Sequence, residues 1–184
     1  MKKIIKIQLL LVLSFLSLSS FGKSEAINLL STDELEMNSK WILKDGLLYP
    51  SEKPGYIIWT KKSFSDFELT VEFKTSTECN SGIFFRTNIN NPVQEGFEIQ
   101  VASPGLYNGK HVVGSLYDAK EPSEIAVKPD GEWNTMVLTC KGPKIKVVLN
   151  GVEVQNLNIN DWDTANKNPD GTKNKRSEEH TFEL

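Results

Sequence analysis

Two β-type runs, SGIFFR at residues 81–86 and GFEIQ at residues 96–100, indicate the fold of this chain. Side chains alternate between the two faces of a strand, so Glu98 and Gln100 share the face opposite their apolar neighbours. If the runs pair as antiparallel neighbours, Arg86 can lie on the same sheet surface as Glu98. Such a group of carboxylate, guanidinium and carboxamide suits a ligand rich in hydroxyls or carbonyls. The alternative is a plain cross-strand ion pair.

The remaining chain also reads as short strands separated by turns. Asp-Gly at residues 45–46 and Asn-Gly at residues 150–151 are strong hairpin signals, and no amphipathic segment reaches helix length. The pattern predicts an all-β protein, an antiparallel β-sandwich. Further strands are expected at residues 41–43, 47–49, 56–59, 67–73, 111–117, 133–141, 144–149 and 152–157.

The length and charge of the chain limit its organisation and partners. It has 184 residues and a formal net charge of -3. Without a leader, this length fits one domain with a sizeable core. Charges of both signs are mixed and form no basic stripe, so we expect no nucleic-acid partner.

Residues 1–26 have the organisation of a secretory signal peptide. A positive start, MKK, precedes a mostly apolar run at residues 7–18, and small residues occur between 22 and 26. We therefore predict cleavage at that point and a periplasmic or extracellular protein. The apolar run is short for a membrane span, and no cysteine follows it to accept a lipid, so we expect no membrane span after cleavage.

The chain has two cysteines, Cys79 and Cys140. Cys140 shares the strand parity of Met136 and Leu138, which predicts a small buried hydrophobe. Export makes a disulfide chemically possible, but we expect two free thiols. Neither cysteine has metal-ligand spacing with a partner, so we predict no metal at either.

An acidic loop near the end of the chain contains oxygen ligands of the type that calcium accepts. Its order lacks the glycine and the terminal glutamate of an EF-hand loop, so we interpret it as a solvated loop. We predict neither a metal nor a cofactor for this protein. The loop residues concerned are Asp161, Asp163, Asn166 and Asp170.

A set of short blocks in a specific order resembles the 3-keto-disaccharide hydrolase domain family. Each block is weak alone, but their order along residues 41–175 is specific. The blocks are KWILKDGLL (40–48), DFEL (66–69), NSGIFFR (80–86), GFEIQ (96–100), GSLYD (114–118), GEWNT (131–135) and LNGV (149–152).

This resemblance implies a concanavalin A-like jelly roll whose concave sheet binds glycans. It also implies cleavage of 3-keto glycosides or disaccharides, which a separate sugar 3-oxidoreductase would supply. The ketone acidifies the hydrogen on carbon 2, so one base can remove it and expel the glycosidic group, with water added afterwards. Paired carboxylates are not required. The alternative is a non-catalytic, lectin-like glycan-binding module, because the same sandwich serves both functions.

Carried over to this chain, the resemblance implies that Glu98 is the catalytic base. Arg86 would orient the substrate or stabilise the developing oxyanion, and Gln100 would contact a hydroxyl or carbonyl of the substrate.

Three more residues are expected to bind substrate. Tyr117 and Asp118 close the GSLYD block and would line the rim of the site. His111 is the only histidine in the body of the domain, and it could act as acid, base or metal ligand. The alternatives are an inert loop histidine and a tyrosine that packs in the core or rim.

The chain departs from the family pattern at its C-terminal end. After NPDG at residues 168–171, members of the family continue into further strands, whereas this chain ends in RSEEHTFEL. We therefore predict that residues 27–175 form a domain without its last strands. Residues 176–184 show no strand alternation, and we expect them to be non-native or disordered.

Overall fold

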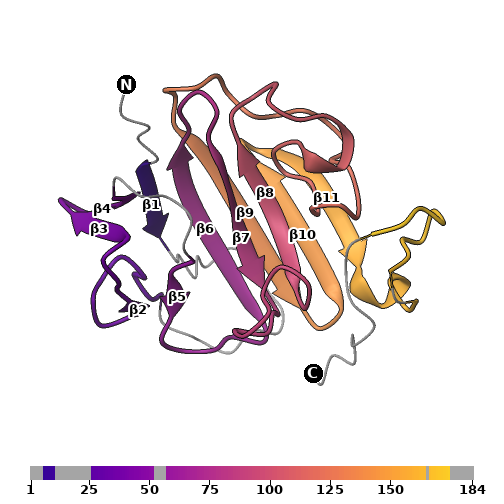
Figure 1. Cartoon of the computed structure of the whole chain (residues 1–184), viewed down its shortest axis with the longest axis horizontal. Coiled ribbons are helices and arrows are strands. Elements are labelled where there is room, and N and C mark those ends of the chain that lie inside the picture. The colour runs from indigo at the N-terminus through magenta and orange to yellow at the C-terminus, as the bar shows by residue number, and fades with distance from the viewer. Residues whose placement is uncertain (1–5, 11–25, 52–56, 165, 175–184) are drawn as a thin grey trace.

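The structure, a computed structural model, describes residues 6–10, 26–51, 57–164 and 166–174, with only the backbone described for residues 6–10. Most of the predicted leader and the predicted tail lie outside these residues. The described strands are all antiparallel, which confirms the predicted all-β sandwich (Figure 1). Within these ranges no helix has the length and apolarity needed to cross a bilayer.

The main sheet contains seven strands in the order β11-β10-β9-β6-β1-β4-β3. The Asp45–Gly46 and Asn150–Gly151 turns join its hairpins as predicted, with positive φ at all four residues, which is typical of type I′ turns. Its strands are β1 (Lys6–Leu10), β3 (Trp41–Lys44), β4 (Leu47–Pro50), β6 (Phe67–Lys74), β9 (Asn134–Lys141), β10 (Lys144–Leu149) and β11 (Val152–Asn158).

A second layer packs on the β6-to-β11 part of this sheet and consists of β7 (Asn80–Phe85) and β8 (Phe97–Ala102). Residues 114–117 run along the free side of β8, through the Ile99–Leu116 bridge. The strand predicted at residues 111–117 is wrong: this segment begins in a 3-10 turn, η1 (Gly109–His111), continues through turns, and pairs only at the isolated bridges of Leu116. A small separate pair, β2 (Leu35–Glu36) with β5 (Trp59–Thr60), completes the strands.

The core lies between the two layers. Met136, Leu138 and Cys140 face it from β9, and Phe97 and Ile99 face it from β8. The alternation of apolar residues predicted from the sequence thus places one face of each strand in the core. The other face of the β7–β8 layer, called here the outer face, carries Glu98 and its neighbours.

β1 lies between β6 and β4, so it connects the β3–β4 hairpin to the rest of the main sheet (Figure 1). Its five residues pair with β6 from Lys6–Lys74 to Leu10–Thr70. β1 lies within the predicted leader, whose removal stays a prediction.

Candidate active site

Glu98 and Tyr117 lie side by side on the outer face. Phe84 of β7 pairs with Glu98 of β8, and the backbone N–H of Tyr117 donates to the Glu98 carbonyl oxygen at 2.9 Å. Residues directly opposite in an antiparallel pair project to the same face. Phe84, Glu98 and Tyr117 therefore form one row across this layer, and all three are partly exposed.

The side chain of Glu98 lies over the backbone of Gly82. A Cβ built on Gly82 would overlap Oε1 of Glu98 and would lie 2.6 Å from its Cδ. A glycine inside a strand weakens the strand and often marks a close approach of another group. Here the missing side chain provides the space that the Glu98 carboxylate occupies.

Gln100 lies one row along the same face but is only 1% exposed. Its side-chain N–H donates to Oδ1 of Asn80 at 3.0 Å, and its backbone exchanges hydrogen bonds with Gly114 and Ser115. The structure therefore places Gln100 beside Glu98, as predicted from parity, but closed off from solvent. Its predicted contact with substrate stays a prediction.

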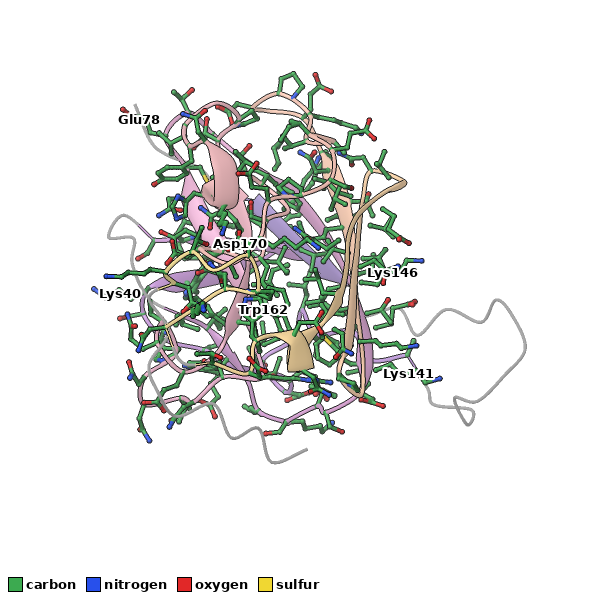
Figure 2. All side chains as sticks on the ribbon, turned by 90° about the vertical axis from the view of Figure 1, so that its right-hand side faces the viewer. Lys40, Glu78, Lys141, Lys146, Trp162 and Asp170 are labelled. Atoms are coloured by element: carbon green, nitrogen blue, oxygen red, sulfur yellow. The ribbon has the colours of Figure 1, made fainter. Side chains whose placement is uncertain are left out.

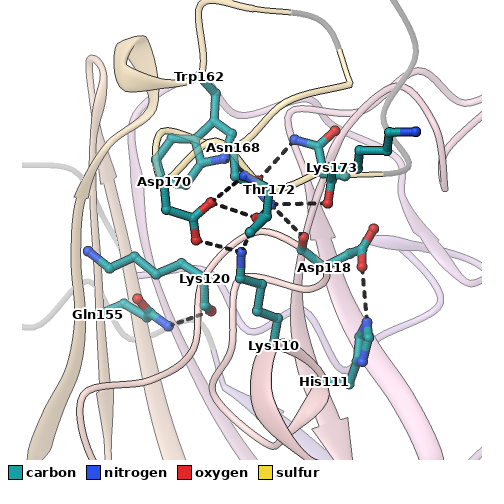
Figure 3. Close-up of polar contacts among 11 residues, drawn as sticks. Lys110, His111, Asp118, Lys120, Gln155, Trp162, Asn168, Asp170, Thr172 and Lys173 are labelled. Atoms are coloured by element: carbon teal, nitrogen blue, oxygen red, sulfur yellow. Dashed lines mark hydrogen bonds and ion pairs between the residues drawn. The ribbon is translucent and has the colours of Figure 1, made fainter.

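His111 and Asp118 form a pair (Figure 3). This pair lies next to Tyr117. Nε2 of His111 lies 3.1 Å from Oδ1 of Asp118, and the rings of His111 and Tyr117 are 4.7 Å apart. The side chains of His111 and Asp118 are 36% and 21% exposed, so a ligand can reach them. A carboxylate that holds one imidazole nitrogen leaves the other available for proton transfer. His111 is thus not an isolated loop histidine.

The acidity of Tyr117 reflects this crowding. Burial raises the pKa of its phenol, and the carboxylates of Glu98 and Asp118 and the nearby Tyr107 raise it further. A phenol with a raised pKa stays protonated at neutral pH and can donate a hydrogen bond. Tyr117 and these three groups therefore form one electrostatic site.

Arg86 does not lie on the outer face. The residue has φ of 48°, a left-handed conformation that ends the alternation of β7. Its Nη2 lies 3.3 Å from the Ser65 carbonyl oxygen and 3.7 Å from Oδ1 of Asp66, and its charge is felt by core residue Cys140. The prediction that Arg86 shares a surface with Glu98 is therefore wrong, because the chain turns at this residue.

The acidic loop is held by the protein itself. Asp170 pairs with Lys110 at 2.8 Å, and the described residues contain no group of three or more side chains suited to hold a metal. Cys79 and Cys140 are buried and form no disulfide. Burial raises the pKa of Cys140 to about 12, so it behaves as the predicted small hydrophobe.

Sequence reasoning missed three parts of the site: Gly82, Tyr107 and the support of Asp118 by Asn168. Asn168 donates from Nδ2 to the Asp118 carbonyl oxygen at 3.1 Å. The glycine inside a strand was a usable signal for Gly82. Nothing local connects Tyr107 or Asn168 to the site, because both come from separate loops.

Comparisons with known proteins agree with the fold. The sequence pattern of a 3-keto-alpha-glucoside-1,2-lyase-like domain matches residues 30–182. The crystal structure of a candidate glycosyl hydrolase from Parabacteroides distasonis ATCC 8503 has a TM-score of 0.73 and 30% identity, over 79% of this chain and 78% of that chain. A second candidate glycosyl hydrolase from the same organism has a TM-score of 0.62 and 20% identity, over 72% of each chain, and shows likeness of fold alone. No curated protein matches the chain.

Proposed function

The chain belongs to the 3-keto-alpha-glucoside-1,2-lyase-like family, and we propose that it cleaves glycosides whose carbon 3 has been oxidised to a ketone. Membership in the family supports a carbohydrate-active role. The observation that carries the finer proposal is the placement of Glu98 in the space above Gly82, beside Tyr117 and close to the His111–Asp118 pair.

In this proposal Glu98 is the base that removes the proton from carbon 2 of the sugar. The ketone at carbon 3 makes this proton acidic, and the electron pair of the broken C–H bond forms the double bond between carbons 1 and 2. The bond from carbon 1 to the glycosidic oxygen then breaks. Water then adds its hydroxyl to carbon 1 and gives its proton back to His111. The proton on Glu98, after exchange with solvent, is returned to carbon 2.

Two neighbours supply the remaining chemistry. Tyr117, kept protonated by its raised pKa, donates a hydrogen bond to the oxygen at carbon 3, where negative charge develops. His111 in its protonated form, oriented by Asp118, donates a proton to the departing glycosidic oxygen. This arrangement replaces the role first predicted for Arg86.

The predicted leader supports action in the periplasm or outside the cell. The ketone must come from another enzyme, because none of the proposed steps oxidises a sugar. A separate sugar 3-oxidoreductase is therefore the expected functional partner.

The test is turnover of a 3-keto disaccharide by the purified full-length protein. Free sugar should be released from the 3-keto disaccharide and not from its unoxidised parent, and in D₂O the product should carry deuterium at carbon 2 above the level exchanged without protein. Binding without release would indicate the lectin-like alternative.

Glu98→Gln should lower this activity by at least about a hundredfold with folding intact, because the amide cannot accept the proton. Glu132→Gln is the matched control, since Glu132 is exposed and lies in the turn that precedes β9 of the main sheet. A Glu98→Gln protein with activity within a few-fold of the parent would remove Glu98 from the mechanism.

A further inference from the structure

Asp118 needs support from the rest of the molecule. Its φ of 59° is a left-handed conformation that a residue with a side chain adopts only when its surroundings hold it there. Its backbone N–H donates to the Lys110 carbonyl oxygen at 3.1 Å. Its own carbonyl oxygen accepts from Nδ2 of Asn168 (Figure 3). The direction of the Asp118 side chain therefore depends on a residue fifty positions later in the chain.

Asn168 is itself anchored in the protein interior. The residue is 2% exposed, and its Oδ1 accepts hydrogen bonds from Nε1 of Trp162 and Nδ2 of Asn174, each at 3.0 Å. Trp162 belongs to the hydrophobic core and lies between the two layers in Figure 2. Nδ2 of Asn168 also lies 3.0 Å from Oγ1 of Thr172. The carboxamide is thus fixed at both ends before it meets Asp118.

A second set of polar contacts connects the same loop to Lys110, the residue before His111. Nζ of Lys110 lies 2.8 Å from Oδ2 of Asp170 and 2.6 Å from Oγ1 of Thr172. The hydrogen bond from Lys110 holds the pKa of Asp170 well below its usual range, and hydrogen bonds from Thr172 add to the effect. The loop therefore contacts the residue before His111 through Asp170 and contacts Asp118 through Asn168.

We propose that Asn168 is a positioning residue, which holds Asp118 in the orientation that makes it orient His111. The loop residues 162–164 and 166–174 then connect the hydrophobic core to the site and hold it in place. Its effect on catalysis rests on the proposed function, whereas its effect on the geometry of His111 does not.

The geometric part is tested by ¹⁵N NMR of the His111 imidazole, in a His180→Gln background that leaves His111 as the only histidine. In the parent, at a pH where the ring is neutral, the proton should occupy Nε2, the nitrogen that faces Asp118. Asn168→Ala should give a mixture of both tautomers, because Asp118 loses its support. Asn160→Ala is the control, since Asn160 lies exposed in the same region.

Lys110→Met provides a second variant, because it removes the tie to Asp170 and leaves the buried contacts of Asn168 in place. It should shift the tautomer balance in the same direction as Asn168→Ala, by a smaller amount. A parent-like His111 spectrum in folded Asn168→Ala would overturn the proposal. If Asn168→Ala does not fold, Asn168→Asp replaces it, because it keeps the oxygen that accepts from Trp162 and Asn174 but removes the Nδ2 donor to Asp118. A parent-like His111 spectrum in that variant would overturn the proposal.

The catalytic part uses steady-state kinetics with a 3-keto disaccharide. Asn168→Ala should lower kcat by roughly ten- to a hundredfold, the loss expected from misplacing a reacting group. KM should change little, because Asn168 is buried. A loss confined to KM would overturn the positioning role. A parent without turnover would instead contradict the proposed function, and the NMR result would still decide the geometry.

Discussion

Asp118 and Arg86 are both left-handed residues with side chains at margins of the β7–β8 layer, but the protein holds them very differently. The backbone of Asp118 is bonded on both sides, to Lys110 and Asn168, and its carboxylate lies beside His111. Arg86 has one long contact to Asp66, one hydrogen bond to Ser65, and a buried Nη1 that has no hydrogen-bond partner among the described residues.

The difference shows how a polar residue acquires a chemical role in this fold. Strand parity predicted that Arg86 lies beside Glu98, but the positive φ of Arg86 turns its side chain away from the outer face. Asp118 had no such pattern in its favour, yet a distant loop fixed it next to an imidazole. Support from remote residues, and not the local pattern, separates the two positions.

The largest expected effect is that of His111→Gln on turnover of a 3-keto disaccharide. Activity should fall by about a hundredfold or more, because glutamine cannot donate the proton to the leaving group. Arg86→Met should retain most of the activity, and His180→Gln serves as the histidine control. An inactive but stably folded Arg86→Met protein would break the comparison and return Arg86 to the mechanism.

A smaller loss of activity is expected for Gly82→Ala. The new Cβ would overlap Oε1 of Glu98, and the flexible end of that side chain must move away. We expect kcat to fall roughly tenfold or more through misplacement of the base, with a nearly unchanged circular dichroism spectrum. Ser81→Ala, at the adjacent position, is the control. Equal activities of the two variants would show that the position of the carboxylate is not critical.

At the Arg86 margin the expected effect is on stability. Asp66→Asn keeps an oxygen for the Gly142 N–H but removes the charge opposite Arg86, so urea unfolding should show a loss of about 1–3 kcal/mol. Arg86→Met should stay within about 1 kcal/mol of the parent or exceed it, because an apolar side chain replaces a poorly paired buried charge. Strong destabilisation by Arg86→Met would show that this ion pair is well satisfied.

The smallest effect concerns the exposed pair of Lys110 and Asp170. The pKa of the Asp170 carboxyl is lowered in the folded state from its ordinary value of 3.8. The pair with Lys110 therefore stabilises the folded protein fully above pH 3.8, and this stabilisation is lost as the pH falls through the lower pKa of the folded state. The parent should therefore melt slightly above Asp170→Asn at pH 6, and the gap should narrow well below pH 3.8. A gap that widens in acid would contradict this sign.

Alternating apolar residues and Asp-Gly or Asn-Gly turns were sufficient to predict most strands, because both signals are local. β6, β9, β10 and β11 lie within two residues of their predicted bounds. The same parity placed Glu98 and Gln100 on one face. It failed at Arg86, because a positive φ in an arginine has no sequence signature. The His111–Asp118 pair depends on a turn and on Asn168, and such long-range contacts leave no periodic pattern.

The position of β1 in the main sheet affects the order in which folding, export and leader removal can occur. Residues 6–10 pair with β6 and β4 in the middle of the main sheet, and they belong to the predicted export leader. The export machinery must bind the leader while the leader is still unfolded. Folding of the precursor would therefore compete in time with translocation. Leader removal would also change the main sheet, since the edges of β6 and β4 that pair with β1 would then have unpaired backbone groups able to bind another strand.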